Sequence, residues 1–357
     1  MLIPTESIGS IPRPRELIDA LKEHQLGKLT QERLNLLYND ALQNTIQLFE
    51  ATGSPVISDG EQLKSSFVTY PLSGLTNITK DGILITFEDG HTRQLPKLSS
   101  GPFRYSHYAG DYIKASKRYT TKPLKQAVIS ASALSLIYPE EGILGYSHET
   151  FINDLVAETI ADIRSCFAEG AHHVQIDFTE GRLSLKLDPS QELLKHFISL
   201  NNRVLEAFTK EDQNRIGIHT CPGGDNDSTH SADIDYKYLI PSLFQLNAGN
   251  FYIQLASEKN PEDVLNTIKQ HLNPGQTIYI GVIDVCNPEV EEPETVRDRV
   301  LCAAEYIPIN QLGTTDDCGF SPFQDDISTS REIAFAKIKS RVVGTKMAEK
   351  YFRKFTI

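Results

Sequence analysis

Three residues of the chain have the types and the spacing of a zinc site. His219 and Cys221 are one residue apart in Gly-Ile-His-Thr-Cys-Pro-Gly-Gly (217–224), and Cys318 lies in Gly-Thr-Thr-Asp-Asp-Cys-Gly (313–319). Imidazole nitrogen and thiolate sulfur are preferred zinc ligands, and three protein ligands leave one position open, as in catalytic zinc sites. The alternative is that both cysteines are small core residues and that His219 is an ordinary hydrogen-bonded histidine. Spacing alone leaves both interpretations open.

The elements that must bring these residues together follow from the hydrophobic pattern. Short apolar, β-branched runs alternate with longer amphipathic segments. We expect strands at residues 2–8, 56–59, 127–131, 173–178, 216–220, 251–255, 278–283 and 311–314. We expect helices at residues 30–52, 148–169, 191–208, 262–271, 294–306 and 328–343. Eight strand–helix repeats predict an α/β fold, a (β/α)8 TIM barrel forming one domain over residues 1–357, with an open doubly wound sheet as the alternative.

One segment, residues 71–121, interrupts this repeat after the second strand. Within it, β-rich runs at residues 83–87 and 92–95 flank an Asp-Gly turn, which predicts a β-hairpin. We interpret the insertion either as a lid over the mouth of the barrel or as a surface excursion.

Polar and metal-capable side chains gather at the expected carboxyl ends of the strands. They are Ile8-Gly9-Ser10, Asp59, Glu61, Asp177, His219, Cys221, Asp284, Cys286, Asp316, Asp317 and Cys318. Barrel enzymes carry their chemistry at this end of the strands. A random placement would scatter such groups over loops and helix faces, so their convergence favours the zinc interpretation.

The charge balance and the cysteine usage limit the classes of partner. The chain has 35 basic and 47 acidic residues, a formal net charge of −12, which argues against nucleic acid or an anionic membrane as the main partner. A small-molecule substrate is the better expectation. Five scattered cysteines, an odd number, do not indicate a disulfide framework. Together with the lack of a signal-peptide pattern or a membrane-spanning run, this predicts a cytoplasmic protein.

In their order along the chain, the strand-end motifs resemble those of a known family. The segments are Ile-Gly-Ser-Ile-Pro (8–12), Asp-Gly-Glu (59–61), Gln-Ile-Asp (175–177), His-Thr-Cys (219–221), Gly-Val-Ile-Asp-Val-Cys-Asn-Pro (281–288) and Asp-Cys-Gly (317–319). They are similar to the catalytic barrel of cobalamin-independent methionine synthase. Each motif is short, but six of them recur in the same order from one end of the chain to the other.

The resemblance implies a zinc-dependent methyltransferase and assigns its binding residues. Zinc would be held by His219, Cys221 and Cys318. The backbone of Ile8, Gly9 and Ser10 would hold the carboxylate of homocysteine, and the carboxylates of Glu61 and Asp177 would hold its ammonium group. The implied reaction methylates the homocysteine thiol, or that of a close analogue, to the thioether of methionine.

The chemistry of the residue types agrees with this assignment. A free thiol has a pKa of roughly 8.5 and is a modest nucleophile near neutrality, whereas a thiol on zinc is deprotonated. Two cysteinates and one neutral histidine would balance the zinc charge, so an added substrate thiolate would stay electron-rich. The methyl donor remains open, and a folate, a corrinoid protein and a small methylated metabolite are all compatible with the sequence.

The chain departs from the family pattern at three points. Where the family has a further glutamate ligand, this chain has Gln254 or Leu255, so the fourth zinc ligand would be Glu258, Cys286 or water. The histidine that acts as general acid in the family corresponds to Cys286, with Asp284 retained beside it; we expect this pair at the catalytic position. The chain has no tryptophan to stack against a folate ring.

Three other functions remain possible from the sequence. A barrel with a similar His-x-Cys pair and a distant cysteine could transfer a thiol to another electrophile, such as an epoxide. A zinc ion without the glutamate ligand could activate water for hydrolysis. A closed four-ligand site that includes Cys286 would instead indicate a non-catalytic binding protein.

Overall fold

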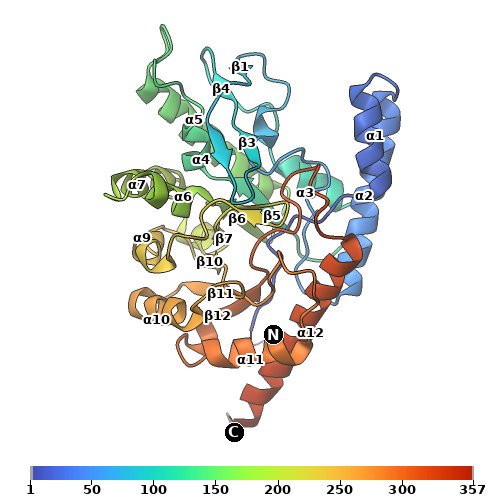
Figure 1. Cartoon of the computed structure of the whole chain (residues 1–357), viewed down its shortest axis with the longest axis vertical. Coiled ribbons are helices and arrows are strands. Elements are labelled where there is room, and N and C mark those ends of the chain that lie inside the picture. Colours follow the sequence, from blue (N-terminus) through green and yellow to red (C-terminus); the bar gives the residue numbers. More distant parts are fainter. Residues whose placement is uncertain (1–2, 356–357) are drawn as a thin grey trace.

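A parallel sheet of six strands lies at the centre of the protein, and helices cover it (Figure 1). The structure, a computed structural model, describes residues 3–355. In their order across the sheet, the strands are β12 (Leu312–Thr315), β11 (Thr277–Gly281), β10 (Asn250–Ile253), β7 (Ile216–Thr220), β6 (His173–Asp177) and β5 (Lys125–Ile129). Nearly all their residues are buried, as expected for apolar strands with both faces covered. The predicted α/β class is therefore confirmed.

Two further parallel segments lie at the edges of this sheet, each joined by a single bridge. Thr5 pairs with Thr314 of β12, and Ile57 pairs with Leu124 beside β5. The predicted strands at residues 56–59 and 2–8, the latter starting outside the described residues, are thus reduced to single bridges. In the first segment Pro4 contributes only its carbonyl, which accepts from the Thr314 amide at 2.9 Å, because proline has no N–H to donate.

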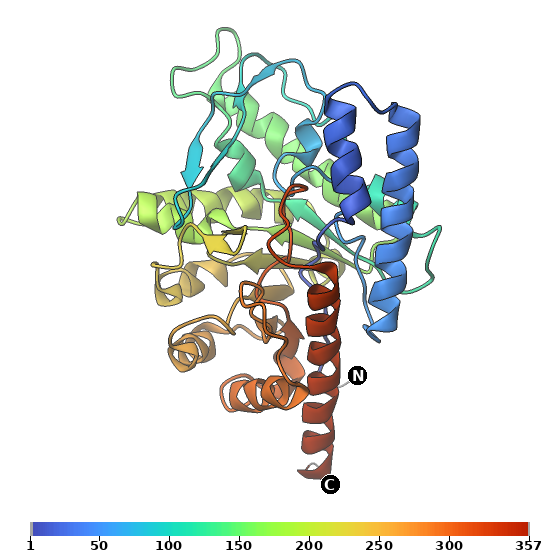
Figure 2. The same ribbon diagram turned by 45° about the vertical axis from the view of Figure 1, so that its right-hand side comes forward.

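Helices follow most of the strands and pack on the outside of the sheet (Figure 2). The larger ones after the insertion are α5 (His148–Ala168), α7 (Glu192–Leu205), α10 (Pro261–His271), α11 (Pro293–Ala303) and α12 (Arg331–Phe355). Most of their bounds fall within a few residues of the prediction. The last helix does not end at residue 343 as predicted, because Gly344 is not a helix terminus. A Cβ there would lie 2.5 Å from Val296 Cβ, so this glycine allows α12 to approach α11.

Several helices have no counterpart in the sequence prediction. They are α1 (Arg15–Gln25), α3 (Gly110–Ser116), α4 (Ala131–Ser135), α6 (Glu180–Leu187), α8 (Lys210–Gln213) and α9 (Ile240–Leu243). Helix α1 pairs with α2 (Gln31–Ala51), which the sequence does predict, and the two stand at one side of the molecule (Figures 1 and 2). They share a small apolar cluster of their own, centred on Leu17 and Leu34.

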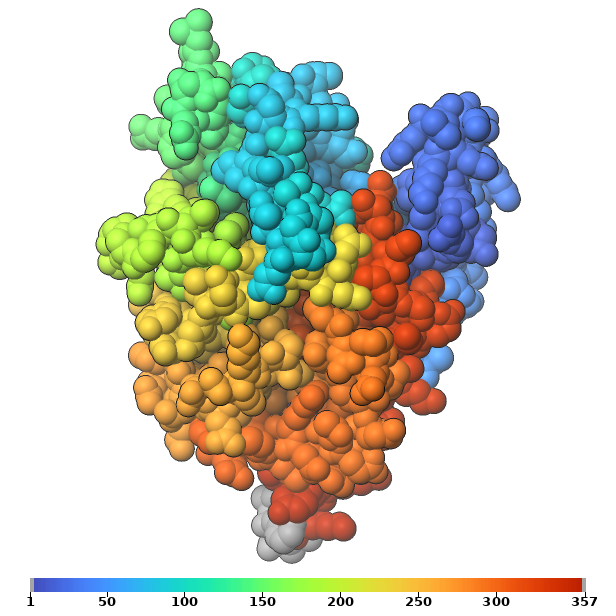
Figure 3. Space-filling model, viewed as in Figure 1, coloured from blue at the N-terminus to red at the C-terminus, as the bar shows by residue number. Residues whose placement is uncertain are grey.

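The insertion contains two short antiparallel pairs. Strand β1 (Ile78–Thr79) pairs with β4 (Lys97–Leu98), and β2 (Leu84–Thr86) pairs with β3 (Thr92–Gln94) at the place where the sequence predicts a hairpin. The turn between β2 and β3 contacts a second small hairpin, β8 (Gly224–Asp225) and β9 (Ser228–Thr229), through a bond from the Glu88 amide to the Thr229 carbonyl. In Figure 3 the insertion, in cyan, lies over the middle of the molecule.

Candidate active site

His219, Cys221 and Cys318 come together at the carboxyl ends of two strands. His219 is in β7, Cys221 follows that strand, and Cys318 follows β12. Their ligand atoms all lie within 4.8 Å of one another, and all three side chains are buried. The two sulfur atoms are 3.3 Å apart, and neither cysteine is in a disulfide. The structure thus brings together the three residues that the sequence proposes as metal ligands.

The His219 ring is held so that one nitrogen is free. Its Nδ1 is 3.3 Å from the carbonyl oxygen of Tyr252, its partner across the β7–β10 ladder. Because a carbonyl only accepts, this contact requires the proton on Nδ1. The Nε2 atom is buried and has no hydrogen-bond partner. A neutral imidazole with a fixed tautomer and a free, buried lone pair is suited to binding a metal ion.

The two cysteines also fit a cation better than they fit an apolar core. The contact with Cys221, followed by burial, raises the pKa of the Cys318 thiol well above its usual value. The Cys318 thiol therefore keeps its proton in the absence of a cation. A divalent ion among them would reverse this preference, because a coordinating thiol loses its proton. The donor set of one imidazole and two sulfurs matches zinc.

A small cavity joins these residues to the predicted amino-acid site. Its lining includes His219 and Cys318 together with Ile8, Ser10, Glu61 and Asp177. Gly9 is not in the lining, but its φ of 151° is unfavourable for other residues, and its carbonyl accepts from Ser58 Oγ at 2.8 Å.

Gly319, directly after Cys318, is required for the first strand end to approach the metal-ligand loop. A Cβ at Gly319 would lie 2.1 Å from Ser10 Oγ, which is closer than any side chain tolerates. The amide of Ser321 donates to the same Ser10 oxygen at 3.2 Å. The absence of a side chain at residue 319 therefore lets Ser10 lie beside the loop that carries Cys318.

Glu61 and Asp177 line this cavity from two different strand ends. Burial raises the pKa of Glu61 to about 7; Lys64 acts in the opposite direction and Asp177 adds to the effect. Burial also raises the pKa of Asp177, against the lowering influence of His219 and Lys64. Glu61 Oε1 is 3.4 Å from Lys64 Nζ, whereas its Oε2 is buried without a partner. Two buried carboxyls thus line one cavity, and one oxygen of Glu61 is left without a hydrogen-bond partner among residues 3–355.

The predicted catalytic pair, Asp284 and Cys286, lines neither this cavity nor the larger cleft beside it. Asp284 Oδ1 accepts from the Cys286 amide at 3.0 Å, and the amide of Asp284 donates to Glu291. Burial raises the pKa of the Cys286 thiol, and the nearby Cys318 adds to the rise. A catalytic role for the pair stays a prediction.

The two protein candidates for a fourth ligand lie outside the metal group. The group that the described residues form at this end of the sheet contains His219, Cys221 and Cys318, and neither Glu258 nor Cys286. Glu258 Oε1 instead accepts from Arg182 Nη1 at 2.6 Å, an ion pair that occupies its carboxylate. Among the options from the sequence, this arrangement leaves a water molecule or a substrate atom for the open position.

Sequence reasoning missed the structural role of Asp317. Its carboxylate accepts from the amides of Leu255, Ala256 and Ser257 at 2.8 to 2.9 Å, and from Ser257 Oγ at 2.7 Å. Asp317 thereby fastens the Cys318 loop to the loop after β10. Gly281 is a signal that could have pointed to this contact, because a Cβ there would lie 1.9 Å from Asp317 Oδ1.

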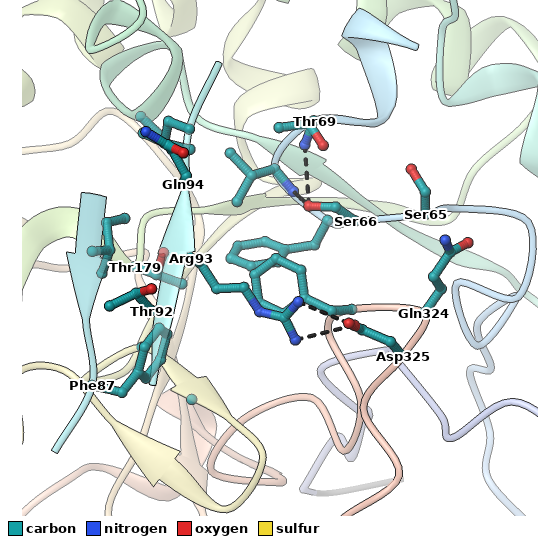
Figure 4. Close-up of a pocket in the computed structure, with 18 of the residues that line it drawn as sticks. Ser65, Ser66, Thr69, Phe87, Thr92, Arg93, Gln94, Thr179, Gln324 and Asp325 are labelled. Carbon is teal, nitrogen blue, oxygen red and sulfur yellow. Dashed lines mark hydrogen bonds and ion pairs between the residues drawn. The ribbon is translucent and has the colours of Figure 1, made fainter. Parts of the chain in front are cut away.

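A larger cleft of about 600 Å³ adjoins the small cavity. Phe67, Thr179 and Gly224 line both spaces. Helix α1 and the β2–β3 hairpin form opposite walls of the cleft, and Figure 3 shows the recess between these two segments on the surface. Figure 4 shows Arg93 of β3 extending across the cleft towards Asp325, with Thr179 and Phe87 beside it. The cleft has the size of a small-molecule binding site and lies next to the small cavity.

Arg93 ties the hairpin to both metal-ligand loops. Its Nε and Nη2 donate to Asp225 at 2.5 and 3.1 Å. Its Nη1 and Nη2 donate to Asp325 at 3.0 Å each, as the dashed lines of Figure 4 show. Asp225 lies four residues after Cys221, and Asp325 lies seven residues after Cys318. The position of the hairpin is therefore coupled by ion pairs to the loops that carry the sulfur ligands.

The comparisons with known proteins agree with the sequence resemblance. Residues 3–336 match the family described as cobalamin-independent synthase, catalytic domain. The methionine synthase of Sulfurisphaera tokodaii is 23% identical over 351 residues, which cover 97% of this chain and 92% of that protein. The methionine synthase of Saccharolobus solfataricus is also 23% identical, over 355 residues that cover 99% of this chain and 97% of that protein. No helix within residues 3–355 is both long and apolar enough to span a membrane.

Two solved structures share the fold. A B12-independent methionine synthase from a Shewanella species, in complex with selenomethionine, matches with a TM-score of 0.76 at 20% identity, covering 99% of this chain and 100% of that one. A putative vitamin-B12 independent methionine synthase from Listeria monocytogenes gives a TM-score of 0.70 at 21% identity, covering 96% of each chain. With nearly the whole chain matched by the family, the protein belongs to the cobalamin-independent methionine synthase family.

Proposed function

We propose that the protein is a zinc-dependent S-methyltransferase that converts the thiol of homocysteine to the thioether of methionine. The observation that carries the proposal is the small cavity whose lining includes His219 and Cys318 together with Glu61 and Asp177. It places a metal-binding donor set beside a carboxylate pair, as an amino-acid thiol requires. The relatives named methionine synthase, and the selenomethionine in the Shewanella structure, support this substrate.

His219 Nε2, Cys221 Sγ and Cys318 Sγ would hold the zinc ion. The unpartnered, buried Nε2 atom and the two adjacent sulfurs support this assignment. When bound, zinc would lower the pKa of a substrate thiol and so keep its sulfur nucleophilic near neutrality. The Tyr252 carbonyl accepts a hydrogen bond from Nδ1–H, which keeps the ring in the tautomer that offers Nε2.

The remaining residues of the cavity would orient the amino acid. Glu61 and Asp177 would accept hydrogen bonds from its ammonium group, since both carboxyls are buried and Glu61 Oε2 has no hydrogen-bond partner among residues 3–355. The backbone of Ile8, Gly9 and Ser10 would donate to its carboxylate. Holding both ends of the amino acid fixes the sulfur with respect to the donor in the adjoining cleft, which lowers the entropic cost of the transfer.

We also propose that the eight parallel segments close into a TIM barrel that forms one domain. Strands β7 and β12 are three positions apart, or about 14 Å in a flat sheet. Cys221 follows β7 and Cys318 follows β12, and their sulfur atoms are nevertheless only 3.3 Å apart. This short distance supports a strong curvature of the sheet. The two edge segments also meet, because the Ile11 amide donates to the Gly60 carbonyl at 3.0 Å. Both observations support closure.

Zinc analysis and a donor screen would test the function. The purified protein is expected to contain about one zinc ion per chain, and the zinc-loaded protein should form methionine from homocysteine with at least one methyl donor. The screen would include 5-methyltetrahydrofolate, methylcobalamin and S-methylmethionine. A protein that binds no zinc under non-chelating conditions, or that forms no methionine with any donor, would contradict the proposal.

A further inference from the structure

Glu180 is a buried carboxyl in the wall of the larger cleft, and one of its oxygens is unused. It is the first residue of α6 and follows Thr179, which lines both the larger cleft and the small cavity. Its Oε1 accepts from Ser130 Oγ at 2.6 Å and from Ser132 Oγ. Its Oε2 is buried and has no partner. Because two hydroxyls donate to Oε1, a proton on this carboxyl belongs on Oε2.

The other ionisable groups of the cleft are poorly suited to donate a proton. Burial, together with Lys186 and Arg182, lowers the pKa of His230 to about 4, so this ring is neutral at physiological pH. Asp325 is exposed and paired with Arg93. Lys22 and Gln25 of α1 lie at the solvent-exposed end.

We propose that Glu180 is the acid that protonates the leaving atom of the methyl donor, and that the donor is therefore a neutral molecule. The proposal rests on the proposed methyl transfer and adds a catalytic residue and a donor class to it. A neutral donor would otherwise release its leaving atom as an anion, so it needs a proton. A sulfonium or other onium donor leaves as a neutral molecule and needs none.

The step balances without any further reactant. The bond between the methyl carbon and the leaving atom breaks, and its electron pair goes to the leaving atom. The substrate sulfur forms the new bond to carbon with its own pair, after its proton has passed to solvent. Glu180 Oε2 gives its proton to the leaving atom and regains one from solvent. In sum, a thiol and a methylated donor become a thioether and a protonated, demethylated donor.

The electrostatics of Glu180 are suited to this role. Burial raises the pKa of Glu180 to about 7, and Asp177 adds to the rise, while the bonds from Ser130 and Ser132 lower it. An acid of this strength is partly protonated near neutrality and can give up its proton readily, which is the condition for efficient general acid catalysis.

The substitution Glu180→Gln tests the proton transfer separately from the hydrogen bonds of the side chain. A glutamine keeps an oxygen for Ser130 and Ser132 but cannot transfer a proton at neutral pH. Glu158→Gln serves as a matched control, because Glu158 is also buried and hydrogen-bonded, to Tyr108 and the Tyr105 amide, yet lines neither cavity. The zinc-loaded proteins would be assayed with homocysteine across a pH series, using 5-methyltetrahydrofolate as the neutral donor and S-methylmethionine as the onium donor.

With the neutral donor, Glu180→Gln is expected to lower kcat by about 10²- to 10³-fold. The wild-type rate should fall as the pH rises above about 7, because Glu180 then loses its proton. Turnover of the onium donor should fall at least tenfold less than that of the neutral donor in this variant, and Glu158→Gln should behave as wild type. Ser132→Ala removes a bond that lowers the pKa of Glu180, so it should shift the wild-type pH profile to higher pH.

Three results would overturn the assignment, and they differ in what they leave standing. An equal loss with both donors, or a wild-type protein that uses only onium donors, would exclude Glu180 as the acid while the methyltransferase function stands. A pH–rate profile that does not shift in Ser132→Ala would also exclude Glu180 as the acid, and this test holds even if Glu180→Gln fails to fold. Failure of the wild-type protein with every donor would refute the proposed function and this inference with it.

Discussion

The substitution Glu61→Gln tests whether the small cavity recognises an amino group. The Glu61 side chain is 3% exposed, its Oε2 has no partner, and its only ion-pair partner is Lys64 at 3.4 Å. A homocysteine ammonium group beside it would form a charge-assisted hydrogen bond. Such a bond contributes about 1.5 to 3 kcal/mol, so the substitution should weaken homocysteine binding by about 10- to 150-fold.

The change in homocysteine affinity with pH is a second measurement of the contribution of Glu61. With a pKa of about 7, Glu61 is about one-tenth ionised at pH 6 and mostly ionised at pH 8. Homocysteine should therefore bind about tenfold more weakly at pH 6 than at pH 8 through this group alone, since one pKa unit corresponds to about 1.4 kcal/mol. Asp177 titrates together with Glu61, so the observed midpoint belongs to the pair. Glu61→Gln should flatten this part of the pH dependence.

Calorimetry with two ligands separates the ammonium effect from effects on the metal. The zinc-loaded protein would be titrated with homocysteine and with 4-mercaptobutyrate, which has the same thiol and carboxylate but no amino group. Both ligands carry the thiol, so the effect of its ionisation on the two Kd values cancels in their ratio. Glu61→Gln should weaken only homocysteine. If both ligands lose affinity equally, Glu61 acts through the metal or the fold, and its assignment to the ammonium group is wrong.

Three further substitutions have defined outcomes. Cys318→Ser should lose zinc and turnover together, as measured by atomic absorption and methionine formation; full zinc occupancy would exclude Cys318 as a ligand. Arg93→Leu leaves the buried Asp225 carboxylate with His91 and Asn226 alone and should lower the free energy of unfolding by about 2 kcal/mol in urea titrations. This is less than the roughly 3 to 5 kcal/mol of a fully buried pair because Arg93 is partly exposed. Glu180→Gln should reduce the decline of stability with pH between about 4.5 and 7. In that window the folded wild-type protein keeps a proton that the unfolded chain has released, so its stability falls by up to about 1.4 kcal/mol per pH unit; an unchanged slope would show that Glu180 is ionised throughout.

The central strands could be predicted from the sequence because burial on both faces requires continuous apolar runs. The expected strand at residues 216–220 coincides with β7, and that at residues 173–178 nearly coincides with β6. The edge segments around Thr5 and Ile57 have similar composition but form single bridges, which depend on pairing partners far away in the chain. The sequence prediction ends the last helix just before Gly344, but the helix continues through it. A glycine is needed there because α12 packs closely against α11 at this position. Local patterns carry no information on either kind of tertiary contact.

The same distinction applies to the candidate site. His219, Cys221 and Cys318 could be proposed because few residue types bind zinc, so type and spacing are themselves informative. Glu180 has no such signal. The sequence prediction has no helix at this position, and in the structure Glu180 lies in the first turn of α6, where the helix dipole favours acidic residues anyway. Its orphaned oxygen and its position in the cleft wall exist only once Ser130 and Ser132 have been folded against it.

The loop that carries Cys318 shows why the ligand set needs little rearrangement to bind a metal ion. Asp316 pairs with the buried Arg341 at 2.6 Å, Asp317 holds three amides of the loop after β10, and Gly319 lies against the first strand-end segment. These neighbours fasten the loop to helix α12, to the loop after β10 and to the N-terminal segment. Both carboxyls are buried; Asp316 is held by its ion pair with Arg341 and Asp317 by its hydrogen bonds to the loop after β10. Fixed, separately supported ligands lower the reorganisation needed on binding, so under the proposed function this loop would supply a pre-organised sulfur to the metal ion.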